Sequence, residues 1–101
     1  GANVNAAAKD GVTSLMLASQ GGHFDLAQAL MGKGANVNAA DEDGYTSLML
    51  ALEGGHFDLA QALVDKGADV NAADKFGCTP LSLAAGHPEV KKVLEQAAED
   101  L

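Results

Sequence analysis

The sequence predicts an all-α solenoid in which short helix-turn-helix units stack side by side. The first observation is repetition: residues 1–33 and 34–66 are identical at 26 of 33 positions, and a looser third copy occupies residues 67–101. The second is that each copy holds a glycine-containing turn followed by two apolar segments separated by further glycines. Residues one period apart therefore occupy equivalent environments in neighbouring units, and we call such a set of residues a column. We expect one domain with repeats at 1–33 and 34–66 and a capping repeat at 67–101.

The first helix of each unit is predicted from its turn and its cap. In the middle copy, Asp43-Gly44 indicates a turn because glycine accepts a positive φ. Thr46 offers a hydroxyl that can cap a helix over residues 47–53, and Gly54-Gly55 terminates it. The apolar residues of this segment are too many for one exposed face, which predicts an inner helix packed between neighbours.

The second helix of the middle copy is predicted from His56 to about Asp65, with apolar residues on one side and polar residues on the other. Gly67 follows at the position where a left-handed residue closes a helix. The segment from Ala68 to Cys78 has no helical periodicity. It is therefore expected to be a hairpin-like connection between units.

The third copy has the features of a terminal unit. Lys91 occupies the column in which the first two copies have Ala27 and Ala60. A stack needs a polar outer face where no further unit covers it, so residues 67–101 are expected to form a C-terminal cap. The first copy keeps its apolar columns. We expect a monomer from which an earlier repeat was removed, with self-association through this N-terminal face as the alternative.

Composition excludes several classes of partner. The formal net charge is −8, and an acidic surface repels phosphate backbones and anionic headgroups, so neither nucleic acid nor a membrane is expected as a partner. No apolar segment is long enough to span a bilayer. The single cysteine, Cys78, rules out an intramolecular disulfide framework and favours an intracellular location, in the cytoplasm or nucleus.

Residues that could carry chemistry have simpler interpretations. His23 and His56 share a column, and neighbouring helices lie ~8–10 Å apart, too far for one metal ion to bridge. We expect these histidines to form local hydrogen bonds. The acidic segment 41–43 lacks the pattern of a calcium loop and is expected to be a solvated turn. Cys78 has no base beside it and is expected to be an exposed or half-exposed contact residue. No metal, cofactor or catalysis is predicted.

The order of these motifs resembles the ankyrin repeat family. The resemblance rests on Gly-x-Thr-Pro-Leu at residues 77–81, a Gly-His pair before the second helix, and Gly-Ala-Asp-Val-Asn-Ala at residues 67–72. It implies β-hairpin-like loops, a protein partner bound through loop tips and the concave inner-helix face, and no catalysis. The near-identity of the first two copies leaves a natural and an engineered origin both open.

The sequence departs from the family in one place. Its usual Pro-Leu-His is Ser-Leu-Met at residues 14–16 and 47–49, and methionine cannot donate the hydrogen bond that the histidine makes to a neighbouring loop. Met16 and Met49 either form a soft patch for an apolar ligand or fill space between inner helices. We favour the second interpretation, because scattered methionines normally pack.

Variation between the copies points to a recognition surface. The copies differ mostly at the loop tip and at the end of the first helix, whereas the solvated outer-helix residues Asp25 and Asp58 are unchanged. Tolerant surface loops are the alternative explanation. We predict Tyr45 and Phe76 as aromatic anchors. The full set of predicted contacts is Lys9, Asp10, Val12, Ser19, Gln20, Glu42, Asp43, Tyr45, Leu52, Glu53, Lys75, Phe76 and Cys78.

Two other functions stay open at this point. The chain could be a structural piece of a larger array with no partner of its own. It could also be a substrate, because Asn5, Asn38 and Asn71 lie in a phrase that, in ankyrin repeats, resembles sites of asparagine hydroxylation.

Overall fold

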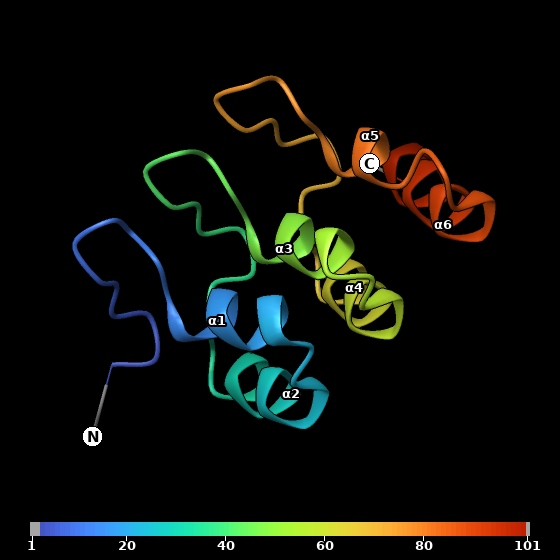
Figure 1. Ribbon diagram of the computed structural model, residues 1–101. Coiled ribbons are helices and arrows are strands. Elements are labelled where there is room, and N and C mark those ends of the chain that lie inside the picture. The colour runs from blue at the N-terminus through green and yellow to red at the C-terminus, as the bar shows by residue number, and fades with distance from the viewer. Residues whose placement is uncertain (1–2, 101) are drawn as a thin grey trace.

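The computed structural model describes residues 3–100, which form three helix-turn-helix units stacked along one axis (Figure 1). We refer to them as unit 1 (residues 3–33), unit 2 (34–66) and unit 3 (67–100). The helices are α1 (Ser14–Gly21), α2 (Phe24–Gly32), α3 (Ser47–Glu53), α4 (Phe57–Asp65), α5 (Pro80–Leu83) and α6 (Pro88–Glu99). The inner helices α1, α3 and α5 form one row and the outer helices α2, α4 and α6 a second, while the three loops project to the same side. The predicted solenoid is confirmed.

The helices of unit 2 agree with the sequence prediction. α3 has the predicted bounds, and α4 begins one residue later than expected, because His56 is its N-cap. The Thr46 Oγ1 atom accepts a hydrogen bond from the backbone N–H of Met49, at 3.4 Å, and so caps α3. Gly67 has the predicted positive φ.

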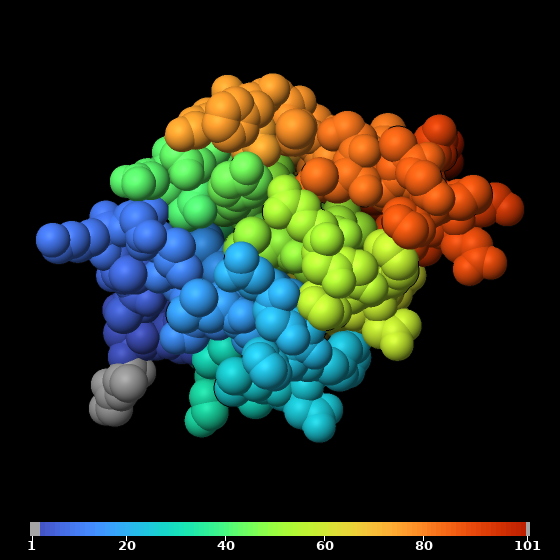
Figure 2. Space-filling model, in the orientation of Figure 1, coloured from blue at the N-terminus to red at the C-terminus, as the bar shows by residue number. Residues whose placement is uncertain are grey.

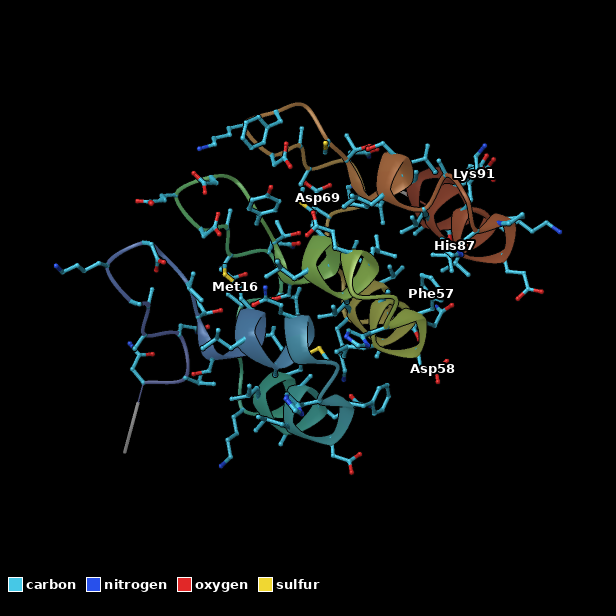
Figure 3. The ribbon with its side chains drawn as sticks, viewed as in Figure 1. Met16, Phe57, Asp58, Asp69, His87 and Lys91 are labelled. Carbon is cyan, nitrogen blue, oxygen red and sulfur yellow. The ribbon has the colours of Figure 1, made fainter. Side chains whose placement is uncertain are left out.

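Methionine contributes to the structure in a way the sequence did not predict. In unit 1, the backbone N–H of Thr13 lies 3.5 Å from the Met16 Sδ atom. The Thr13 hydroxyl in turn accepts a hydrogen bond from the backbone N–H of Met16, at 3.3 Å. The sulfur therefore completes a reciprocal cap at the start of α1. Met16, labelled in Figure 3, and Met49 are both fully buried, so the packing interpretation is right and the surface-patch alternative is wrong.

The connections between units are hairpin-like, as predicted. Single antiparallel bridges pair Ala7 with Thr13 and Ala40 with Thr46 at the base of the first two loops. Gly44 makes the reversal with φ +86°, and its Cα faces the next loop, so that a Cβ here would lie 2.9 Å from the Cα of Asp74. Neighbouring loops are therefore in close backbone contact.

The core is a thin layer between the two rows of helices. Small residues Ala18, Ala51 and Ala84 form one buried column, and Ala27 and Ala60 form another. In unit 3, Lys91 occupies that second column and is exposed on the outside of the stack (Figure 3). No helix within residues 3–100 has the length and apolarity needed to cross a membrane.

Candidate functional site

The tips of the three loops lie side by side and form one continuous edge, which we call the loop-tip ridge (residues 8–12, 41–45 and 74–78; Figure 2). Backbone hydrogen bonds hold the tips in register. The N–H of Glu42 donates to the carbonyl of Asp10 at 2.8 Å, and the N–H of Lys75 donates to the carbonyl of Asp43 at 2.9 Å. The ridge is thus a structured surface, with each tip bonded to the next.

The second and third tips are also organised from within by an aspartate, at a position where the first tip has Ala8. The Asp41 carboxylate accepts hydrogen bonds from the backbone N–H groups of Asp43 and Tyr45, at 2.9 and 3.0 Å. Asp74 makes the same pair of bonds in the third loop. The turn predicted at residues 41–43 is present, with Glu42 exposed and Asp41 and Asp43 half-buried. The Asp41 carboxylate is occupied by hydrogen bonds to its own loop.

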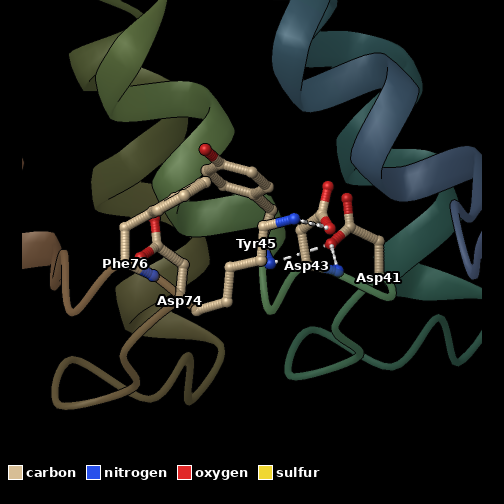
Figure 4. A network of polar contacts seen from close by, with 6 residues as sticks. Asp41, Asp43, Tyr45, Asp74 and Phe76 are labelled. Atoms are coloured by element: carbon tan, nitrogen blue, oxygen red, sulfur yellow. Dashed lines mark hydrogen bonds and ion pairs between the residues drawn. The ribbon is translucent and has the colours of Figure 1, made fainter.

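One ion pair links two tips. The Lys75 ammonium lies 2.7 Å from Asp43 Oδ1 and 5.1 Å from the centroid of the Phe76 ring (Figure 4). The hydrogen bond to Asp43 raises the pKa of Lys75 above its usual value of 10.5. The bond therefore favours the charged ammonium, which stays protonated at neutral pH.

The two predicted anchors differ in exposure. The Phe76 side chain is 70% exposed at the outer end of the ridge, whereas Tyr45 is half-buried beside Asp74 (Figure 4). Partial burial, and then the negative charges of Asp74 and Glu53, raise the pKa of the Tyr45 hydroxyl above 10.0. Tyr45 is therefore neutral at physiological pH and lies in a region of negative potential.

Two predicted contact residues are corrected. Ser19 and Leu52 share a column at the end of the inner helices, and they are only 0% and 4% exposed. The Ser19 hydroxyl donates to the carbonyl of Leu15 at 2.7 Å, and Leu52 belongs to the hydrophobic core. Their helix faces point into the stack, because the next inner helix packs against them, so neither residue can contact a partner.

The remaining predicted residues are accessible. Lys9, Asp10, Gln20, Glu42, Glu53, Lys75 and Phe76 are exposed, and Val12, Asp43, Tyr45 and Cys78 are half-buried. Except for Gln20 and Glu53, which lie at the ends of α1 and α3, all belong to the loop-tip ridge. The half-exposed state predicted for Cys78 is confirmed.

His56 forms a different contact from the one predicted for the histidines. His56 Nε2 lies 3.2 Å from the carbonyl oxygen of Gln20, in the preceding unit, and neither His23 nor His56 caps its own helix through its side chain. The expectation of a local bond is therefore wrong for His56. Its ring reaches across the unit boundary and packs over Gly22, where an added Cβ would lie 2.5 Å from ring atoms.

Sequence reasoning missed the structural role of two asparagines. Asn5 Oδ1 accepts from the N–H of Asn36 at 2.6 Å while its Nδ2 donates to the carbonyl of Gly34 at 3.2 Å. Asn38 repeats both bonds one unit later, to Asp69 and Gly67. The signal was present, since an identical asparagine in every unit predicts an identical role. Within residues 3–100, the side chain of Asn71 makes no such bond.

The described residues offer no metal site of the usual kind, as no group of three His, Cys, Asp or Glu side chains gathers in residues 3–100. The geometry instead provides a rigid, mostly acidic edge bearing aromatic side chains. Such an edge can make contacts over a wide area of a partner.

Comparison with known proteins agrees with this architecture. A family model that describes ankyrin repeats in three copies matches residues 15–100. A comparison with curated proteins found no match to this chain. Ankyrin repeats are generally protein-interaction modules. On the repeat architecture and this match over most of its length, the chain belongs to the ankyrin repeat family.

Proposed function

We propose that this chain is a scaffold that binds a protein partner through the loop-tip ridge and the exposed ends of the inner helices. The observation that supports this most directly is the combination of rigidity and exposure. The tips are joined by backbone hydrogen bonds, yet Phe76 is 70% exposed at the edge. An exposed aromatic ring on a rigid support contributes contact area at a low cost in conformational entropy.

The inner-helix ends extend the surface. Gln20 and Glu53 are exposed beside the ridge and adjoin its loops. Ser19 and Leu52 are buried beneath this surface, so we do not include them among the contacts. Partner contacts then come from Lys9, Asp10, Val12, Gln20, Glu42, Asp43, Tyr45, Glu53, Lys75, Phe76 and Cys78.

The charge of the surface indicates the chemistry of the partner. Asp43 compensates Lys75, while Glu42 and Glu53 are exposed and have no ion-pair partner among residues 3–100. The negative potential around Tyr45 has the same sign. Complementarity of potential then favours a partner that presents a basic or neutral polar surface. No catalytic activity is proposed.

The test is a comparison of two double variants. Partners captured by the unmodified chain are identified by mass spectrometry, and their affinities are measured by calorimetry. Tyr45→Ala with Phe76→Ala should weaken binding on the order of tenfold or more, as the loss of aromatic anchors does. Asp25→Ala with Asp58→Ala, on the outer helices, should leave affinity unchanged. Equal affinity of both double variants, with both folded by circular dichroism, would reject the ridge as the binding surface.

A structural role in a larger array is the main alternative. It predicts that the ridge variants change no affinity, because no partner engages the ridge. The comparison of the two double variants therefore separates the two functions.

Asparagine hydroxylation is a second candidate, and the structure favours one of its three positions. All three asparagines are exposed, but Asn5 and Asn38 are each held by two bonds to the next unit, whereas the Asn71 side chain makes no such bonds within residues 3–100. Hydroxylation would replace a Cβ–H of asparagine by Cβ–OH, with oxygen from O₂ and electrons from an oxidisable co-substrate of the enzyme. Asn71 should react first, because its segment can enter an active site without breaking inter-unit bonds.

The measurement is intact mass and peptide mapping after incubation with such a hydroxylase. The expected product carries one added oxygen, on Asn71. Modification only on Asn5 or Asn38 would contradict the proposed order, and no modification would exclude this chain as a substrate of that enzyme.

A further inference from the structure

An apolar groove runs between the outer helices of units 2 and 3. α4 and α6 lie side by side in the outer row (Figure 1). Between them is a cavity of about 210 Å³, with walls that include the half-buried apolar side chains of Phe57, Val64, Val90 and Val93. One adjoining hollow shares Phe57 and Val90 with this cavity, and another shares Val64 and Val93. The three therefore form one continuous depression, which we call the outer groove.

The groove exists because two interface side chains are shorter here than between units 1 and 2. The junction before α6 has two residues fewer than the junction before α4, so Val90 falls in the column of Leu59. Val64 falls in the column of Met31. Met31 and Leu59 are 8% and 2% exposed, whereas both valines are half-buried. The valines leave space between α4 and α6 that the longer side chains fill between α2 and α4.

One end of the groove is aromatic. The rings of Phe57 and His87 face each other from α4 and from the start of α6, with their centroids 4.5 Å apart and their planes tilted by 52° (Figure 3). Pro88, Glu89 and Val90 continue this wall along α6. Because each ring packs against the other, the wall is held in place from both helices.

The rim of the groove is mostly acidic. Asp58 and Glu89 flank the central cavity. The hollow at the far end is lined by Asp65, Lys92 and Asp100. All five side chains are exposed, and none of them forms an ion pair within residues 3–100. An apolar floor under a rim of carboxylates is complementary to a ligand that is apolar on one face and basic at its edges.

We propose that the outer groove binds an amphipathic helix of a partner protein, with large apolar side chains on one face and lysine or arginine along its edges. The cavity of about 210 Å³ is smaller than the roughly 300–1,000 Å³ of sites for drug-sized ligands, so it suits one anchoring side chain of a longer ligand. An amphipathic helix presents such anchors at intervals along one face, and the neighbouring hollows accept further ones. This surface lies on the outer helices and is separate from the loop-tip ridge.

Two other occupants fit less well. A second copy of this chain has a formal net charge of −8, and the outer helices of that copy would bring Asp25 and Asp58 toward the acidic rim. The surface of an anionic membrane would be repelled by the same carboxylates. A basic amphipathic helix satisfies both the apolar floor and the charge of the rim.

The test uses a synthetic helical peptide. The peptide is as long as α6, 12 residues, with leucine on one face and lysine on the other. A side-chain crosslink holds it helical, because isolated helices of this length are marginal in water. Calorimetry measures its affinity for the full chain, and amide chemical shifts map where it binds. We expect the largest shifts in α4 and α6. A peptide with glutamate in place of lysine should bind on the order of tenfold or more weakly, because it carries the charge of the rim.

Matched variants locate the site. Val93→Lys places an ammonium on the apolar floor and should weaken peptide binding on the order of tenfold or more. Ala29→Lys adds the same charge at the equivalent, exposed position of α2 and should leave the affinity unchanged. The double variant Tyr45→Ala with Phe76→Ala should also leave it unchanged, so failure of the groove is distinguishable from failure of the ridge. Circular dichroism checks that each variant is folded.

Several results would overturn the proposal. They are no binding of the lysine peptide, equal affinity of Val93→Lys and Ala29→Lys, equal affinity of the lysine and glutamate peptides, and shifts centred on α2 or on the loop tips. Glu89→Lys, at an exposed position of the rim, is the second groove variant if Val93→Lys is unfolded. It should also lower the affinity, because it replaces a carboxylate that faces the basic edge of the peptide, and an unchanged affinity would reject the groove.

Discussion

Lys75 and Asp43 contact each other twice, once through their side chains and once through their backbones. The ammonium lies 2.7 Å from Oδ1 of Asp43, and the backbone N–H of Lys75 donates to the carbonyl of Asp43 at 2.9 Å. The ion pair therefore lies directly over the hydrogen bond that sets the register of two loop tips. Asp43 therefore contributes both a charged side chain and a backbone acceptor at the centre of the proposed binding surface.

Alkaline pH tests this pair. The pKa of Lys75 is raised by its bond to Asp43, so its contribution to stability is complete below the usual lysine value of 10.5 and is lost as pH rises above it. We expect the thermal midpoint to fall above that pH and to fall less in Asp43→Asn. The control Asp58→Asn, on the outer helix, should keep the full loss. An identical alkaline decline in Asp43→Asn would show that the pair does not contribute.

A pair of glycine variants tests the close approach of the loops. Gly44 and Gly77 have similar positive φ values, +86° and +82°, so alanine is strained at both by about 1 to 2 kcal/mol. Only at Gly44 would the new Cβ also meet backbone, 2.9 Å from the Cα of Asp74. Gly44→Ala should therefore lower the free energy of unfolding more than Gly77→Ala in denaturant titrations. Equal losses would mean that the second and third loop tips move apart to accommodate the added Cβ at no cost in free energy.

The asparagine column offers a second matched pair. Asn38 bonds both the N–H of Asp69 and the carbonyl of Gly67, whereas Asn71 bonds no following unit within residues 3–100. We expect Asn38→Ala to cost about 1 to 2 kcal/mol, as loss of two partly solvated hydrogen bonds does. Asn71→Ala should cost much less. Chemical denaturation measures both, and a larger loss at Asn71 would contradict the bridging role.

The leucine column tests the asymmetry of the stack. Leu59→Ala removes a fully buried side chain and should cost about 2 to 5 kcal/mol. Leu26→Ala, at the same column position but 53% exposed, should cost well under half as much. Unfolding by urea gives both values. Similar losses would indicate that the surface of unit 1 around Leu26 is already covered in solution, and size-exclusion chromatography would then detect an oligomer.

Local chemistry explains why the helices could be predicted so closely. Thr46 caps α3 through a hydrogen bond three residues away, and Gly54 is its C-cap. Such signals act within one turn of the chain, so residues 47–53 could be assigned from the sequence alone. The period of 33 residues extends that assignment to the starts of α1 and α5. α1 ends one residue later than the period gives, at Gly21, and α5 ends three residues earlier, at Leu83.

The candidate site was only partly predictable. The loop-tip residues from Lys9 to Cys78 lie along one edge, as their columns indicated, but Ser19 and Leu52 are buried. Variation between copies does not distinguish a residue that contacts a partner from one that packs against the next helix. The bonds of His56 and Asn38 were missed for a related reason, because their partners lie 36, 31 and 29 residues away.

The sequence by itself determined the repeat, the bounds of α3 and α4 to within one residue, the turns and the net negative charge, because periodicity and capping are local properties of the chain. The tertiary structure decided which helix face is buried, which neighbour each histidine and asparagine bonds, and that Leu26 lies in solvent while Leu59 lies in the core. Two identical segments received different environments because burial depends on what stacks against a surface, and that is fixed by packing between units.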